Sequence, residues 1–251
     1  MIELDQFFAD ISDEIAKDVS DRASLQDLEH RFDLSLIPYH SKINSWTSTI
    51  PTELNDVFKE TFNFEEELKT NLAKFNTELS GLECKSSQRE SLSNKFVQDS
   101  IFVVLSNRYF WVLAMAYTTA PITIHVVTSG DNCGIVATPK EIFSALGVND
   151  INYQSYLLAL LKLTDVLVDY TTATVINQSI GSENSASPNY TLGLINSNIV
   201  SKLQNGFSLL DLKNDALRKR YDGLKYSSQK LNKIVYDLSL RNLITTTADI
   251  L

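Results

Sequence analysis

The chain has 251 residues, 43% of them hydrophobic and 21% charged, a composition typical of soluble globular proteins. Its five prolines and eight glycines are too few for a low-complexity or collagen-like chain, and its two cysteines and three histidines are too few for a disulfide scaffold or a Cys- or His-rich metal centre. With 22 basic against 31 acidic residues the net charge is −9, so composition alone does not favour nucleic acid as a partner. We expect no metal and no cofactor.

The first third of the chain has the periodicity of long amphipathic helices. Apolar residues recur every three or four positions over residues 2–35 and again over residues 52–80, which predicts two helical regions. We expect Pro38 and Pro51 to interrupt the helical pattern between these two regions. Pro51 should lie in the first turn of the second region. Gly81 is a natural helix end.

The middle of the chain is more apolar. Residues 91–119 are predicted to form a helix, and the most apolar stretch, residues 101–127, contains Asn107, Arg108 and Pro121. A bilayer span needs about 20 uninterrupted apolar residues. We therefore expect a buried core helix and no membrane partner.

An irregular insertion is expected near residues 118–137, where turn residues replace the helical pattern. Thr138, Pro139 and Glu141 then form a capping-box signature for a short helix that Gly147 ends. Residues 152–178 are predicted to form another long apolar helix. No composition shift suggests a linker, so residues 1–251 are interpreted as a single domain.

Two further helices are predicted near residues 190–211 and 215–242. The last one carries a heptad seam whose members are spaced four and three residues apart, namely Leu217, Tyr221, Leu224, Ser228, Leu231, Val235 and Leu238. Its basic residues lie mostly off that seam. They form either a solvated face of a packing helix or a surface for phosphates.

Charge is unevenly distributed along the chain. Residues 1–100 carry twenty acids and ten bases, whereas residues 201–251 carry nine bases and five acids. A basic C-terminal segment on an acidic protein makes nucleic acid a partner to consider after all.

Common catalytic signatures are missing from the sequence. No G-x-x-x-x-G-K-[ST], G-x-G-x-x-G, H-E-x-x-H, C-x-x-C or G-x-S-x-G motif occurs. Asp165 and Asp169 lie four apart on an apolar helix and so share a face that could hold a divalent metal. The simpler interpretation is that this face of the helix is exposed to solvent, or that its carboxylates pair with a basic side chain.

Residues 205–226 and 234–241 closely resemble the C-terminal signature of the translin family, and residues 138–147 and 156–158 resemble it more weakly. The resemblance implies an all-α fold of about seven helices that assembles into a hollow, octamer-like shell. It also implies binding of single-stranded RNA and DNA, and a partnership with translin-associated factor X in an endoribonuclease. We expect a location in the cytoplasm, and in the nucleus as well, since the N-terminus lacks the basic region of a signal peptide.

The nuclease belongs to the factor X subunit of that complex. Its carboxylates correspond by the resemblance to Lys162 and Val166 here, and neither side chain binds a metal as a carboxylate does. The chain is therefore interpreted as the binding subunit and not as an enzyme.

The residues expected to contact phosphates are Arg218, Lys219, Arg220 and Lys225, together with Lys95 and Arg108. The family's Arg/His-rich stretch before the central helix is largely missing here, since residues 94–100 contain only Lys95. Together with the net charge, this favours an alternative function, a structural scaffold with weak or lost affinity for nucleic acid that serves assembly with a factor-X-like subunit. A nuclease that uses Asp165 and Asp169 is the third interpretation.

Overall fold

The computed structural model describes residues 4–58, 64–119, 136–150, 152–180, 190–213 and 216–244. Every regular element within these ranges is helical, which confirms the predicted all-α fold. The elements are α1 (Leu4–Ser48), the 3-10 turn η1 (Pro51–Glu53), α2 (Leu54–Phe58), α3 (Phe64–Gly81), α4 (Ser86–Thr119), α6 (Pro139–Leu146), α7 (Tyr153–Ile180), α8 (Thr191–Ser208) and α9 (Ala216–Leu240).

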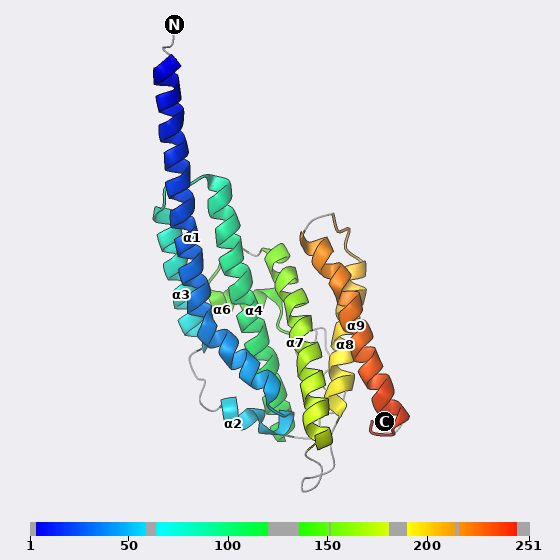
Figure 1. Ribbon diagram of the computed structural model, residues 1–251. Coiled ribbons are helices and arrows are strands. Elements are labelled where there is room, and N and C mark those ends of the chain that lie inside the picture. Colours follow the sequence, from blue (N-terminus) through cyan, green and yellow to red (C-terminus); the bar gives the residue numbers. More distant parts are fainter. Residues whose placement is uncertain are drawn as a thin grey trace.

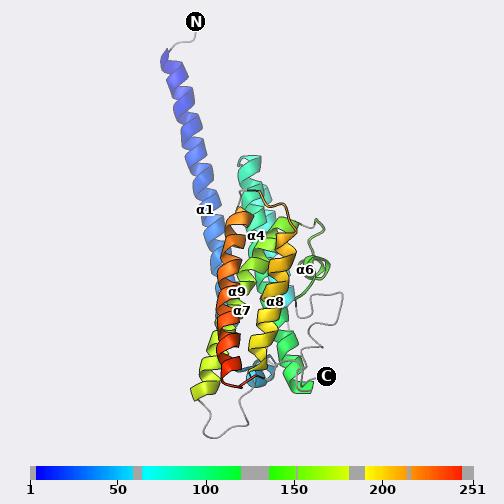
Figure 2. The same ribbon diagram turned by 90° about the vertical axis from the view of Figure 1, so that its right-hand side faces the viewer.

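Helices α4 and α7 pack against each other at the centre of the fold. On one side, α1, α2, α3 and α6 cover α4, and on the other, α8 and α9 cover α7 (Figure 1). Turned by 90°, the molecule shows α8 and α9 side by side in front of α7 (Figure 2). Because α7 stands between α4 and α9, basic residues of α4 and α9 belong to different parts of the surface.

Helix α4 is the predicted buried core helix. In the described part of the chain it is the one helix long and apolar enough to cross a membrane, yet most of that apolar stretch is buried in the protein. Ile101, Val103, Tyr109 and Phe110 have no exposed surface. The prediction of a core helix is confirmed, because neighbouring helices cover these side chains.

A hydrogen-bonded polar group lies inside the apolar core. The hydroxyl of Tyr109 donates to Oδ1 of the fully buried Asn196 at 2.8 Å, and Nδ2 of Asn196 donates to Oγ1 of Thr171 at 2.9 Å. These bonds join α4, α8 and α7. Since a buried polar group without a partner is costly, they fix the register of three helices.

The expected interruption at Pro38 is wrong, because α1 continues through Pro38 to Ser48. The buried stripe of α1 also continues past this residue with Tyr39, Ile43 and Trp46, so packing holds the helix together where the proline removes a hydrogen bond. Helix α1 bends on its way across the molecule, which is the usual effect of a proline inside a helix (Figure 1).

Several other boundaries agree with the sequence, although the helical region predicted over residues 52–80 is found as η1, α2 and α3. Pro51 opens η1, α3 ends at Gly81, and Thr138 and Glu141 form both bonds of a capping box at the start of α6. Gly147 follows α6 with a φ of 67°, a left-handed conformation that favours glycine. The insertion predicted near residues 118–137 lies mostly outside the described residues.

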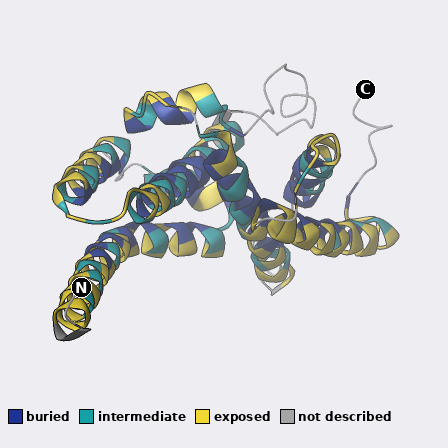
Figure 3. Cartoon of the chain, turned by 90° about the horizontal axis from the view of Figure 1, so that it is seen from above, coloured by how far each residue is buried: buried dark blue, intermediate teal, exposed yellow. Residues whose placement is uncertain are grey.

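The N-terminal part of α1 extends beyond the rest of the protein (Figure 1). Seen from above, this end of the helix is almost entirely exposed, whereas the remaining helices turn their buried faces toward one another (Figure 3). Its exposed side chains include several that are large and apolar: Phe7, Phe8, Ile15 and Val19.

Candidate nucleic-acid interface

Helix α9 carries the main candidate surface, and its position follows from the heptad seam. The seam faces α7 and α8, with Leu217, Leu224 and Leu231 buried, and Val235 partly buried at its C-terminal end. The ring of Tyr221 stacks on Phe207 of α8, with the centroids 5.7 Å apart. With one face fixed in this way, the opposite face of α9 is directed outward.

The outward face carries a stripe of lysines around an exposed aromatic ring, which we call the α9 stripe: Lys219, Tyr226, Lys230 and Lys233. Lys219, Tyr226 and Lys233 follow one another at intervals of seven residues. Each therefore lies only about 20° around the helix axis from the one before it. All four side chains are exposed, and Tyr226 is 68% exposed. Within the described ranges none of the three lysines lies at ion-pair distance from a carboxylate, although burial raises the pKa of Asp165 of α7 and the charge of Lys230 is close enough to offset part of that rise.

Arg218 and Lys225 lie on a second line of α9, since they too are seven residues apart. Arg218 is already engaged, because its Nε lies 3.6 Å from Asp222 and its guanidinium carbon lies 5.8 Å from the ring centroid of Tyr221. Lys225 is exposed. Of the predicted residues, these two lie next to the α9 stripe without belonging to it.

Arg220 points in another direction, toward α7. Its guanidinium lies 3.7 Å from Asp165, and Ser227 Oγ donates to the same carboxylate at 3.5 Å. Burial raises the pKa of Asp165, and the nearby Arg220 offsets this only in part. Asp165 is thus paired with a base across the α7–α9 contact, which was the simpler interpretation of this carboxylate.

The two predicted basic residues on α4 are held by carboxylates. Lys95 Nζ donates to Glu29 at 2.7 Å and to Asp33 at 2.9 Å, both on α1. Burial lowers the pKa of Lys95, but its hydrogen bonds to Glu29 and Asp33 raise it by more, so the net pKa lies above the ordinary value. Arg108 donates two hydrogen bonds to Glu65, at 2.7 and 2.9 Å, which raise the pKa of its guanidinium.

Lys162, which the resemblance is expected to place where the factor X subunit has a carboxylate, is also engaged. Its ammonium lies 3.3 Å from Asp99 and 4.3 Å from the ring centroid of Phe102. Among the described residues, no three His, Cys, Asp or Glu side chains lie together as metal ligands would.

The structure therefore divides the six predicted residues into groups. Lys219 belongs to the α9 stripe, Arg218 and Lys225 flank it, Arg220 faces α7, and Lys95 and Arg108 lie in ion pairs on α4. Tyr226, Lys230 and Lys233 are not among the six residues expected to contact phosphates, although Lys230 and Lys233 are among the off-seam bases of the last predicted helix. The heptad register could have found them, because it assigns all three to the side of α9 opposite the seam.

Comparison with known proteins gives the family. The model of the Translin family matches residues 28–242, and the chain belongs to this family. Translin of Gallus gallus is 31% identical over 163 residues, which cover 62% of this chain and 64% of that protein. The translins of Homo sapiens and Mus musculus are 56% identical over 52 residues, which cover 21% of this chain and 23% of each relative. The chain thus matches slightly less than two thirds of the chicken protein's length.

Proposed function

We propose that this protein binds single-stranded RNA and DNA and assembles into an oligomer, as the binding subunit of a translin/factor-X-type endoribonuclease complex. The α9 stripe carries the proposal. Exposed lysines free of ion pairs within the described ranges supply the salt-dependent attraction for phosphates, and an exposed tyrosine among them supplies a ring on which a base can stack. Such a surface recognises backbone and stacking rather than sequence.

The experiment is fluorescence anisotropy of the full chain with a labelled single-stranded RNA across a salt series. The triple variant Lys219→Gln, Lys230→Gln, Lys233→Gln is compared with a variant of equal charge change on α1, α3 and α6: Lys42→Gln, Lys74→Gln, Lys140→Gln. We expect the first variant to bind more weakly and to flatten the slope of log K against log salt by about 2, since each contact to a single strand contributes about 0.7. Equal binding by wild type and both variants would contradict the proposal.

A second function, an assembly scaffold without appreciable affinity for nucleic acid, is favoured by one observation. Lys95 and Arg108 are occupied by Glu29, Asp33 and Glu65, so this part of the surface offers few free cations. If wild-type protein shows no RNA binding even at low salt, the scaffold becomes the better proposal. In that case a factor-X-like subunit is the partner to seek.

We also propose that the chain itself is not a nuclease. The counterparts of the factor X carboxylates are Lys162 and Val166, and Asp165 is paired with Arg220. Purified protein incubated with labelled RNA and Mg²⁺ should show no turnover. If cleavage does occur, its loss in Asp165→Asn and Asp169→Asn variants would overturn this part of the proposal.

Assembly is supported by the exposed apolar stripe of α1, defined by Phe8, Ile11, Ile15 and Val19. Phe8, Ile15 and Val19 are each about 60% exposed on a helix that extends away from the protein. An isolated helix in water has little stability of its own, so this segment needs a packing partner. We propose that another subunit of a hollow, octamer-like shell covers the stripe.

A further inference from the structure

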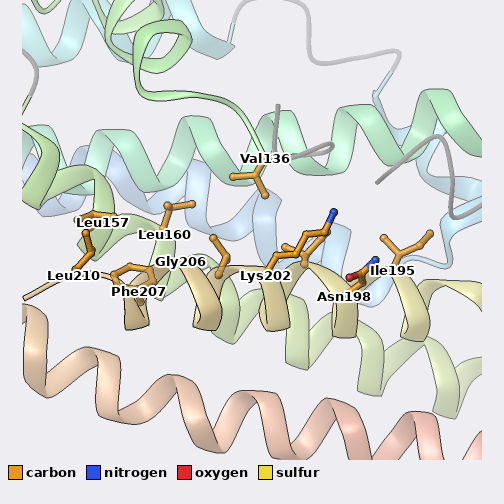
Figure 4. A pocket seen from close by; sticks show the side chains of 11 residues that line it. Val136, Leu157, Leu160, Ile195, Asn198, Lys202, Gly206, Phe207 and Leu210 are labelled. Carbon is orange, nitrogen blue, oxygen red and sulfur yellow. The ribbon is translucent and has the colours of Figure 1, made fainter. Parts of the chain in front are cut away.

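A cavity of about 270 Å³ opens between α7 and α8, close to Val136, which precedes α6 (Figure 4). Eleven residues line it, and all but Asn198, Lys202 and Gly206 are apolar. None of them lies on α9. The cavity is therefore separate from the α9 stripe and independent of the proposed function.

The cavity walls are parts of well-packed elements. Ile195 is fully buried, and Leu160 of α7 is 5% exposed. Phe207 is 3% exposed and is held from behind by its stacking on Tyr221 of α9. An apolar hollow that the protein's own side chains leave unfilled loses contacts along its lining. Its inner wall is held by packing and its outer side reaches solvent at Leu210, which is 42% exposed, so a small molecule can enter and fill it.

The two ends of the cavity differ in polarity. Figure 4 shows Leu157, Phe207 and Leu210 together at one end, and Lys202 and Asn198 toward the other, where Ile195 also lies. Asn198 and Lys202 are four residues apart on α8, so the amide and the ammonium lie on the same face of the helix. Lys202 is exposed and forms no ion pair within the described ranges. The arrangement suits a molecule with an apolar body and one anionic group.

We propose that this cavity binds an aliphatic carboxylate of medium chain length. Its chain lies against Leu157, Phe207 and Leu210, and its carboxylate meets Lys202 and Asn198. A volume of about 270 Å³, just below the usual range for drug-sized ligands, favours a narrow ligand. A nucleobase does not fit this chemistry, because its edges carry several donors and acceptors and the lining offers only two polar side chains.

Calorimetric titration of the full chain with decanoate and with decan-1-ol tests the proposal. We expect saturable decanoate binding at least tenfold tighter than decanol binding, and Lys202→Gln should reduce it to the level of decanol. Gly206→Leu should abolish the binding of both, because a side chain added at this residue of α8 has open space before it and enters the cavity.

Gly223→Leu is the matched control. Gly223 lies in α9, outside the cavity, and a Cβ there also meets nothing within 4 Å. Leucine has the higher helix propensity in both cases, so neither variant should lose helix content, which circular dichroism checks. The proposal is overturned by a lack of saturable decanoate binding to the wild type, or by binding that persists in Gly206→Leu. Equal affinities for decanoate and decanol would overturn the assignment of Lys202.

Discussion

Tyr226 is the side chain on which the proposed nucleic-acid surface of α9 can be tested most directly. Its ring is 68% exposed on the outer face of α9, with lysines one and two turns away. The protein's own packing does not require an aromatic ring at this exposed position. A nucleic-acid base, by contrast, gains from a flat ring next to cations.

We therefore expect Tyr226→Ala to weaken binding of single-stranded RNA by at least about fivefold, since one stacked base contributes about 1–3 kcal/mol. Tyr226→Phe keeps the ring and should bind like the wild type. Because the side chain is exposed, neither change should alter the urea midpoint. RNA titrations by anisotropy check the affinities, and equal weakening by Ala and Phe would show that stacking is not involved.

Buried tyrosines determine how the protein responds to alkaline pH. Burial raises the pKa of Tyr117 to about 12 and raises the pKa of Tyr109 and Tyr170 further above the ordinary value of 10. In the unfolded chain these hydroxyls ionise near pH 10, while in the folded protein they stay neutral. The stability they contribute is therefore complete below pH 10 and is lost as pH rises through the folded pKa values.

We expect the free energy of unfolding to fall by about 1.4 kcal/mol per pH unit for each such tyrosine between pH 10 and 12. Urea denaturation at pH 9, 10 and 11 measures the slope. Tyr117→Phe should make the slope shallower by one tyrosine's contribution, because only Tyr117 loses its ionisable group. A free energy that does not change over this pH range would contradict the burial of these hydroxyls.

At the scale of the element, the sequence predicts most of the helices and fails where packing overrides a local signal. The break expected at Pro38 does not occur, because Tyr39, Ile43 and Trp46 continue the buried stripe beyond it. Local signals do succeed at Thr138 and Gly147, where the hydrogen bonds lie within a few residues of chain. Boundaries fixed by neighbours in sequence are thus more predictable than those fixed by contacts across the fold.

The candidate site shows the same limit. The basic segment could be found from its composition, but Arg218, Lys219 and Arg220 point in three directions because successive residues of a helix are about 100° apart. Which of these side chains reaches solvent depends on how α9 packs against α7 and α8, and these helices lie elsewhere in the chain. The ion pairs of Lys95 and Arg108 were similarly hidden, because their partners are separated from them by 43 to 66 residues.

The capping box of α6 gives a prediction at this scale. Thr138 Oγ1 accepts the N–H of Glu141, and the Glu141 carboxylate accepts the N–H of Thr138 at 2.7 Å. Thr138→Ala should lower the free energy of unfolding by about 1 kcal/mol, whereas Thr138→Ser keeps the cap and should cost less. Urea denaturation of the two variants checks this, and equal midpoints for both would show that the cap contributes nothing.

At the scale of the whole molecule, the protomer has two exposed faces that take no part in its own packing. The α9 stripe is basic, and the N-terminal part of α1 is acidic, with six acids and two bases over residues 4–24. The α9 stripe and this acidic end of α1 lie far apart in the fold (Figure 1). A basic face proposed to bind nucleic acid is compatible with a net charge of −9, because twenty of the 31 acids lie in residues 1–100.

Substitutions in the apolar stripe of α1 test the proposed assembly. Phe8→Asp with Ile15→Asp places two charges on the stripe, and each side chain is 60% exposed in the protomer, so folding of the single chain should be unaffected. We expect light scattering after size-exclusion chromatography to show a smaller assembly than for the wild type, because a subunit contact would have to bury both charges. The control, Ala9→Asp with Ser20→Asp, adds the same charge about a third of a turn around α1 from the centre of the stripe and should leave the mass unchanged. If both double variants keep the wild-type mass, the α1 stripe is not a subunit contact, and RNA binding by the α9 stripe would then have to be explained without this assembly.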